Sequence, residues 1–316
     1  MQRDKGRVFL TGGRTRRKGI KLVLPSNIED LARGFPGSWA IAYGTLAEGD
    51  ITELVELGSK DSFPLASVSK LFTALAVHVA IEEGTLDAKA PMLSNSASIY
   101  DLLSHSSGLP FGFPEQGDSA FEKIQLDPSP ARRRVYSNVG YEALADHLAK
   151  ESGMTFSDYL FEAVADPLGA KGLELDLGLY CSSGPTGAAA GLVAKVSDLV
   201  ALVKGFISSG ILSQETLMLI REPYHPDLAG LVPGFGFMRP CPWGLGPEVK
   251  GEKFPHWTGA ANSGHTFGHF GQSGSSLWID PENGCFLATL SSVAFGDWAK
   301  NLWPTLSDAV VELSAP

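Results

Sequence analysis

The chain has 316 residues, of which 44% are hydrophobic, enough for one large unit or two interleaved lobes with a sizeable buried core. Its formal net charge of −10 at pH 7 argues against nucleic acid and anionic membranes as main partners. No run of the sequence approaches the roughly 18 apolar residues that a membrane-spanning helix needs.

The N-terminal region combines a basic cluster at residues 14–21 with a short apolar run at residues 20–25. This run is too short for the apolar part of a signal peptide, so we expect a solvated extension and a cytoplasmic protein, with an extracytoplasmic location left open. Cys181, Cys241 and Cys285 are odd in number and widely spaced, which predicts reduced thiols.

Alternating apolar residues predict strands near both ends of the chain. Residues 39–43 and 51–57 form a first predicted hairpin, joined across a Glu-Gly-Asp turn. Residues 276–280 and 285–290 form a second one around a Pro-Glu-Asn-Gly turn. The sheet is therefore expected to be antiparallel and assembled from both ends of the chain.

Helical patterns occupy the middle of the chain, where residues 67–188 are helical and rich in turns. We predict an α+β fold with an α/β lobe built from residues 1–66 and 189–316 and a mostly helical lobe at 67–188. The active site is expected at the seam between the lobes, where pockets usually form. Further helices are predicted at residues 27–33, 197–206 and 213–220.

The segment Ser67-Val68-Ser69-Lys70 opens an apolar run and carries a hydroxyl and an amine on one helical face. Residues three apart on a helix are neighbours, so Lys70 can reach back to Ser67, whereas Ser69 points elsewhere. Burial lowers the pKa of a lysine towards the range in which a neutral amine takes a proton from a serine. The alternative is that Ser67 caps a core helix and Lys70 extends to solvent.

A second segment, residues 135–141, runs from extended backbone into a helical pattern, with Ser137 or Asn138 as the helix cap. In extended backbone the side chains of Tyr136 and Asn138 point the same way. A phenol and an amide facing one cleft supply a general base and a hydrogen bond to a substrate carbonyl. The alternative is an ordinary capped helix with a half-buried tyrosine.

A third segment, residues 268–274, precedes the second hairpin, and its glycines allow a ligand or another backbone to come close. We expect His269 to present an imidazole beside the nucleophile and the Gln272 N–H to face a developing oxyanion. The alternative is a glycine-rich strand whose histidine is an ordinary surface or core residue.

The order and spacing of these segments resemble the serine-reactive penicillin-binding protein and class C β-lactamase superfamily. Its members include D-alanyl-D-alanine carboxypeptidases, D-aminopeptidases and family VIII esterases. The resemblance extends over residues 38–292 and includes similar landmarks at 102–110 and 189–199. The matched motifs are Ser-x-x-Lys at Ser67 and Lys70, Tyr-x-Asn at Tyr136 and Asn138, and Lys-Thr-Gly or His-x-Gly at His269 and Gly271.

The resemblance implies a β-lactamase/transpeptidase-like fold and a serine hydrolase that acts through an acyl-enzyme. In this reading Ser67 is the nucleophile, Lys70 and Tyr136 handle the proton, and Asn138 orients the substrate. His269 keeps the Tyr136 phenol primed, while the Ser67 and Gln272 N–H groups stabilise the oxyanion.

We expect a small ester or amide as substrate and no metal or other cofactor, and the sequence does not indicate an oligomeric state. Hydrolysis of small carboxylic esters is the leading function. D,D-peptidase, D-aminopeptidase or β-lactamase activity is the alternative, and a non-enzymatic binding module of the same fold is a second one.

One departure from the superfamily pattern bears on the substrate. Phe270 follows the third-motif histidine where many members carry a hydroxyl, and Gln272 follows Gly271 where Thr or Ser is usual. Those hydroxyls are expected to bind the carboxylate of a β-lactam or of a terminal D-alanine. Their absence weakens the expected recognition of such substrates, unless Ser273 replaces them.

Overall fold

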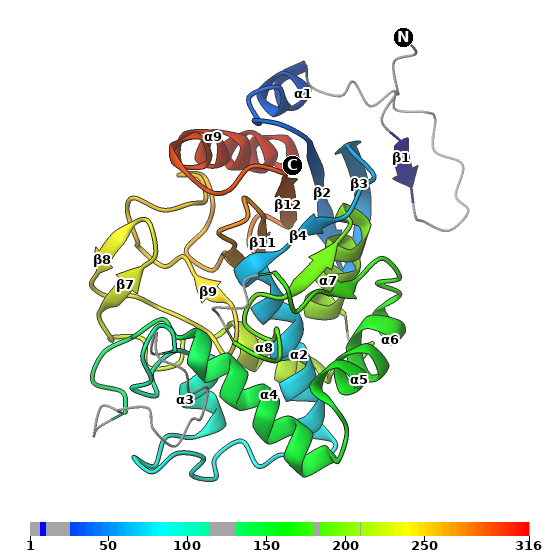
Figure 1. Ribbon diagram of the computed structural model, residues 1–316. Helices are drawn as coiled ribbons and strands as arrows, with labels where there is room; N and C mark the ends of the chain where they lie inside the picture. Colours follow the sequence, from blue (N-terminus) through cyan, green and yellow to red (C-terminus); the bar gives the residue numbers. More distant parts are fainter. Residues whose placement is uncertain (1–6, 11–25, 114–129, 180–183, 209, 316) are drawn as a thin grey trace.

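The computed structural model describes residues 7–10, 26–113, 130–179, 184–208 and 210–315 (Figure 1). Its main sheet has seven strands in the order β1-β3-β2-β12-β11-β10-β9, and every neighbouring pair is antiparallel. The strands are β1 (Arg7–Leu10), β2 (Trp39–Ala47), β3 (Asp50–Gly58), β9 (Glu248–Val249), β10 (Phe267–Phe270), β11 (Ser276–Asp280) and β12 (Cys285–Ser291). The sheet joins segments from both ends of the chain, and both predicted hairpins are confirmed.

Each face of this sheet carries its own hydrophobic core, because successive side chains of a strand point to opposite faces. In β2, Ala40 and Ala42 belong to one core, whereas Ile41 and Tyr43 belong to the other. The helix α7 (Val196–Ile207) packs on the first face, and α1 (Ser26–Ala32) and α9 (Asp297–Ser314) cover the second. Burial on both faces explains why β11 and β12 are buried at every residue.

The helical region is built around α2 (Ser69–Glu82), which is buried almost all round, as its apolar sequence predicts. It contacts α4 (Asn138–Ser152), α5 (Phe156–Leu160) and α7 (Figure 1). The helix ends at Glu82, and Gly84 follows it with a φ of 82°. The remaining helices are α3 (Ile99–Leu103), α6 (Asp166–Leu168), which a π-helical turn at Phe161–Ala165 precedes, and α8 (Gln214–Arg221).

Besides the main sheet, the structure has a sheet of three strands and a sheet of two strands. The strands β4 (Phe63–Pro64) and β5 (Glu174–Leu175) both pair with β6 (Leu192–Ala194), which fixes the chain just before α2. The hairpin of β7 (Gly230–Val232) and β8 (Gly236–Met238) stands beside the main sheet. The predicted α+β fold is thereby confirmed, whereas the division into two lobes at residues 67 and 188 stays a prediction.

The predictions for the cysteines and for a membrane-spanning helix can be compared with the described residues. Cys241 and Cys285 are free and buried, whereas Cys181, the basic cluster at 14–21 and most of the loop at 111–127 lie outside the described residues. Within the described ranges, no helix combines the length and apolar character required to cross a bilayer.

Candidate active site

Ser67 lies in a short 3-10 turn, Ala66–Val68, directly before α2. The sequence places it at the head of the helix, but the α-helix proper begins at Ser69. The preceding residue, Ala66, has a φ of 45°, a left-handed conformation that is strained for a residue with a side chain. The Ser67 hydroxyl lines a cavity, whereas the Ser69 hydroxyl accepts a hydrogen bond from the Leu192 N–H at 3.1 Å. Of the two serines, therefore, Ser67 is the one available to a substrate.

Lys70 is fully buried one turn further on, which excludes the alternative in which it extends to solvent. Its Nζ donates to Asn138 Oδ1 at 2.7 Å and to the carbonyl of Ala189 at 2.8 Å. Burial lowers the pKa of this amine to about 7. A neutral amine uses its two N–H bonds for these two acceptors, so its lone pair remains to accept a proton.

Glu142 is a buried carboxylate whose charge acts on Lys70. It accepts hydrogen bonds from the N–H and hydroxyl of Thr186, both at 2.7 Å, and from the Ala189 N–H at 3.0 Å. Its charge opposes the lowering of the Lys70 pKa, which burial dominates. Glu142 therefore holds the segment that contacts Lys70 and limits how far the Lys70 pKa falls.

Tyr136 connects Ser67 to His269. Its hydroxyl lies beside the Ser67 side chain and 3.4 Å from His269 Nε2. His269 Nδ1 lies 2.7 Å from the carbonyl of Phe270, an acceptor, so Nδ1 carries the proton and Nε2 is free to accept one from Tyr136. In this arrangement the Tyr136 hydroxyl lies between the side chains of Ser67 and His269.

The protonation states of these side chains follow from burial. Burial raises the pKa of the Tyr136 phenol, and burial together with the nearby Lys70 charge lowers the pKa of His269 to about 4. At neutral pH Tyr136 is therefore a phenol and His269 a neutral imidazole. Their interaction is a hydrogen bond and not a charge interaction.

His105 supports Tyr136 from behind. Its ring centroid lies 4.4 Å from that of Tyr136 and 4.9 Å from that of Trp243, and its Nδ1 accepts the Ser137 N–H at 3.1 Å. Ser137 in turn caps α4 by accepting the Gly140 N–H. Asn138 is thus the first residue of α4 and not part of an extended pair with Tyr136, which corrects the predicted geometry. Both side chains nevertheless line the same cavity.

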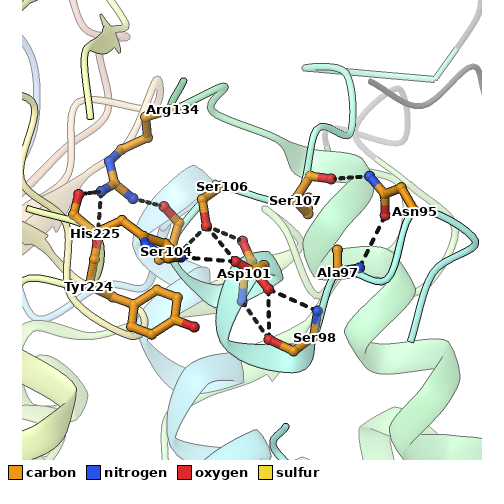
Figure 2. Close-up of polar contacts among 10 residues, drawn as sticks. All are labelled: Asn95, Ala97, Ser98, Asp101, Ser104, Ser106, Ser107, Arg134, Tyr224 and His225. Carbon is orange, nitrogen blue, oxygen red and sulfur yellow. Dashed lines mark hydrogen bonds and ion pairs between the residues drawn. The ribbon is translucent and has the colours of Figure 1, made fainter. Parts of the chain in front are cut away.

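Buried Arg134 anchors the strand that leads into Tyr136. Figure 2 shows its guanidinium donating to the carbonyls of Ser104, Tyr224 and His225, and a fourth bond reaches the carbonyl of Cys241. In the same view Asp101 accepts from Ser98 and Ser106 and lies 3.3 Å from the His225 ring. These contacts hold the loops on both sides of His105.

The third segment meets the nucleophile at Gly271. A Cβ at this position would lie 2.2 Å from the Leu65 carbonyl oxygen and 3.2 Å from Ala66 Cβ, so only glycine fits. Ser275 Oγ adds a hydrogen bond to the same carbonyl at 2.6 Å. Within the described residues, the backbone N–H groups of Ser67 and Gln272 donate to no backbone carbonyl. Both remain available to a substrate oxygen.

The cavity at this point has a volume of about 190 Å³ and brings together the predicted residues Ser67, Tyr136, Asn138, His269 and Gln272. The cavity is otherwise lined by Ala66, Phe111, Gly112, Ala190, Pro233, Trp243 and Phe270. Lys70 and Gly271 do not line the cavity but contact residues that do. Lys70 donates a hydrogen bond to Asn138, and Gly271 lies against Ala66.

Comparison with known proteins assigns the family. The β-lactamase family model matches residues 49–309, more than half of the chain. The chain belongs to the β-lactamase family. A crystal structure of a β-lactamase from Mycobacterium bovis is 36% identical, with a TM-score of 0.82 and a match that covers 92% of this chain and 100% of that one.

Other proteins to which the chain is similar have varied descriptions. Penicillin-binding protein 4* of Bacillus subtilis is 31% identical over 143 residues, which are 38% of this chain and only 32% of that protein. The match therefore spans about a third of that curated relative. EstCE1, described as a hydrolase with promiscuous acyltransferase activity, is 19% identical with a TM-score of 0.68 and shares the fold, over 90% of this chain and 97% of its own.

The sequence alone leaves four residues of this β-lactamase-family site without a role: His105, Arg134, Glu142 and Trp243. Glu142 has a local signal, since it lies four residues after Asn138 on the same helix face. The other three contact partners far along the chain, and no spacing rule identifies such contacts.

Proposed function

We propose that this β-lactamase-family protein is a serine hydrolase that cleaves small carboxylic esters through an acyl-enzyme on Ser67. The observation that carries the proposal is the position of Tyr136 between Ser67 and His269, beside a fully buried lysine whose pKa is lowered to about 7. A hydroxyl with an adjacent neutral base is the arrangement that nucleophilic catalysis requires. The description of EstCE1 as a hydrolase agrees with this chemistry.

In the acylation step the Ser67 oxygen attacks the ester carbonyl carbon while its proton passes to neutral Lys70. The carbonyl oxygen becomes an oxyanion, which the N–H groups of Ser67 and Gln272 stabilise. When the C–O bond of the ester breaks, Tyr136 protonates the departing alkoxide and regains a proton from the Lys70 ammonium. The alcohol leaves, and the acyl group remains on Ser67.

Deacylation reverses these roles with water as the nucleophile. The water proton passes to Lys70 by way of Tyr136, and the Ser67 oxygen leaves with a proton returned along the same path. His269 holds the Tyr136 hydroxyl in place, and Asn138 both anchors Lys70 and presents its amide to the acyl carbonyl. The free carboxylic acid is released.

The preference for neutral esters rests on the third segment. Phe270 is packed among aromatic rings, with Phe295 at 5.0 Å between ring centroids, and offers no hydrogen bond to a carboxylate. The Ser273 hydroxyl lies 3.0 Å from that of Ser275 and is not part of the cavity lining, so it does not replace the missing hydroxyl. A carboxylate bound here would lose solvent without gaining these hydrogen bonds, which costs about 1–3 kcal/mol or more.

The test compares hydrolysis of p-nitrophenyl acetate with acylation by a fluorescent penicillin, for the wild type, Ser67→Ala and the matched control Ser69→Ala. We expect ester turnover in the wild type and Ser69→Ala, none in Ser67→Ala, and slow or no penicillin labelling. Rapid stoichiometric penicillin labelling without ester turnover would favour the D,D-peptidase or β-lactamase alternative. Absence of both reactions in all three proteins would favour a binding module.

A further inference from the structure

A second cavity adjoins the catalytic one. Its volume is about 530 Å³, and Phe111, Tyr136 and Pro233 line both cavities. The two cavities are therefore neighbours. We call the second cavity the side groove; it lies between the strand that leads into Tyr136 and the β7–β8 hairpin.

Apolar side chains form most of the walls of the side groove, and the exposed Arg133 lines it beside them. Phe111 is 58% exposed, Leu231 is 56% exposed and Phe237 is 64% exposed, and all three line it. Large apolar side chains exposed together around a hollow are typical of a binding surface. The Arg239 guanidinium covers one side of the Phe237 ring at 5.9 Å, which supports that wall.

A close contact between two backbone segments forms the floor of the side groove. Arg134 and Gly230 form a β-bridge, and the Arg134 N–H donates to the Ala229 carbonyl at 2.8 Å. A Cβ at Gly230 would lie 2.7 Å from both Cβ and the carbonyl oxygen of Arg134, so the two backbones are in close contact. This floor leads directly to Tyr136, because the bridged strand continues into it.

Only one of the two parts of a bound ester can extend into the side groove. Of the residues assigned to the reaction, Tyr136 lines the groove, whereas Ser67, Asn138 and Gln272 do not. The acyl group stays on Ser67 near Asn138 and Gln272, and the departing oxygen must lie within hydrogen-bond distance of its proton donor, Tyr136. The group that extends past Tyr136 is therefore attached to the departing oxygen.

On the basis of the proposed function, we propose that the side groove binds the alcohol part of the substrate and that this part is an extended apolar group. The acyl side is confined to the smaller catalytic cavity of about 190 Å³. The preferred substrates are thus esters of a short acid and a long or bulky apolar alcohol.

The experiment compares the isomeric esters hexyl acetate and ethyl hexanoate, which have the same atoms and differ only in the side that carries the chain. Acid release is followed with a pH indicator, with ethyl acetate as the reference substrate. We expect kcat/KM for hexyl acetate to exceed that for ethyl hexanoate by roughly tenfold or more, since each buried methylene contributes several-fold.

The matched variants are Leu231→Ala with Phe237→Ala, which removes the walls, and Leu313→Ala with Phe254→Ala, which removes exposed side chains of the same two kinds elsewhere. The first pair should lower kcat/KM for hexyl acetate by about tenfold and leave ethyl acetate unchanged. The second pair should leave both substrates unchanged.

Two kinds of failure are distinguishable. If ethyl acetate is hydrolysed but ethyl hexanoate equals or exceeds hexyl acetate, or if the wall variants affect ethyl acetate equally, the inference on the side groove is wrong and the esterase proposal stands. If no ester is hydrolysed, both proposals are wrong.

Discussion

Lys70 is the residue on whose protonation the proposed chemistry depends most. Burial dominates its pKa and lowers it to about 7, while the Glu142 charge acts in the opposite direction. Below that pH the amine is an ammonium and cannot accept the Ser67 proton; above it the amine is neutral and can. The sign of the shift therefore makes activity rise with pH through the neutral range.

We predict that kcat/KM for a neutral ester rises through an inflection near pH 7. Lys70→Arg should lose activity on the order of a hundredfold or more at every pH, because a guanidinium does not deprotonate in this range. A pH–rate profile from pH 5 to 9 provides the measurement. A flat profile, or an active Lys70→Arg enzyme, would show that Lys70 is not the base.

Recognition of carboxylate-bearing substrates is easier to test by substitution at Gln272 than at Phe270. Phe270 is packed against Phe295 and Trp303, so shortening it leaves a core cavity, whereas Gln272 is exposed. We predict that Gln272→Thr increases the rate of acylation by benzylpenicillin roughly 5–30-fold, the effect of one restored hydrogen bond.

The control for that prediction is Gln272→Val, which has the shape of threonine without its hydroxyl. Stopped labelling with a fluorescent penicillin measures both variants against the wild type. Equal rates for the threonine and valine variants would mean that the hydroxyl has no part in carboxylate recognition.

At the scale of elements, the contact between β10 and the turn before α2 depends on Gly271. A Cβ there would lie 2.2 Å from a backbone oxygen, which no side-chain adjustment relieves. We predict that Gly271→Ala displaces the Gln272 N–H from the oxyanion position and reduces kcat about a hundredfold, as the loss of one oxyanion donor does.

The matched control is Gly264→Ala in the loop before β10, where the nearest atom to an added Cβ is 3.6 Å away. It should keep wild-type kcat and thermal stability. A Gly271→Ala enzyme with wild-type kcat would contradict the assigned oxyanion site.

Elements also show what local sequence patterns can predict. The buried character of α2, both hairpins and the spacing of Ser67 and Lys70 follow from periods of 2 and 3.6 residues, which short windows contain. The start of α4 cannot be predicted from a short window, because Ser137 and Asn138 are both good caps. The choice between them depends on the contact of Ser137 with His105. The 3-10 turn at Ser67 is likewise set by β4 and β10 and not by its own residues.

At the scale of the whole molecule, Arg134 joins three distant parts of the chain. It donates to carbonyls that follow α3 and α8 and to one that precedes β9, and among the described residues no carboxylate forms an ion pair with it. Burial lowers the pKa of its guanidinium to about 10. Such a residue is not predictable from the sequence, because its partners lie 30 to 107 positions away.

We predict that Arg134→Met lowers the free energy of unfolding by about 2–4 kcal/mol, since it leaves buried carbonyls without donors. Arg33→Met is the control: this arginine is 77% exposed and forms a surface pair with Asp30, so its loss should cost less than about 1 kcal/mol. Urea denaturation measures both. Equal, small effects would show that solvent or relaxed neighbours replace the Arg134 contacts.

The central claim is that Ser67 forms the acyl-enzyme, and rapid-quench mass spectrometry tests it most directly. The protein is mixed with p-nitrophenyl acetate, quenched in acid within milliseconds and digested, and the acetylated peptide is sequenced. We expect one acetyl group on Ser67 in the wild type and in Ser69→Ala, and none in Ser67→Ala. An acetyl group on Ser69 or another residue, or turnover by Ser67→Ala at the wild-type rate, would contradict it.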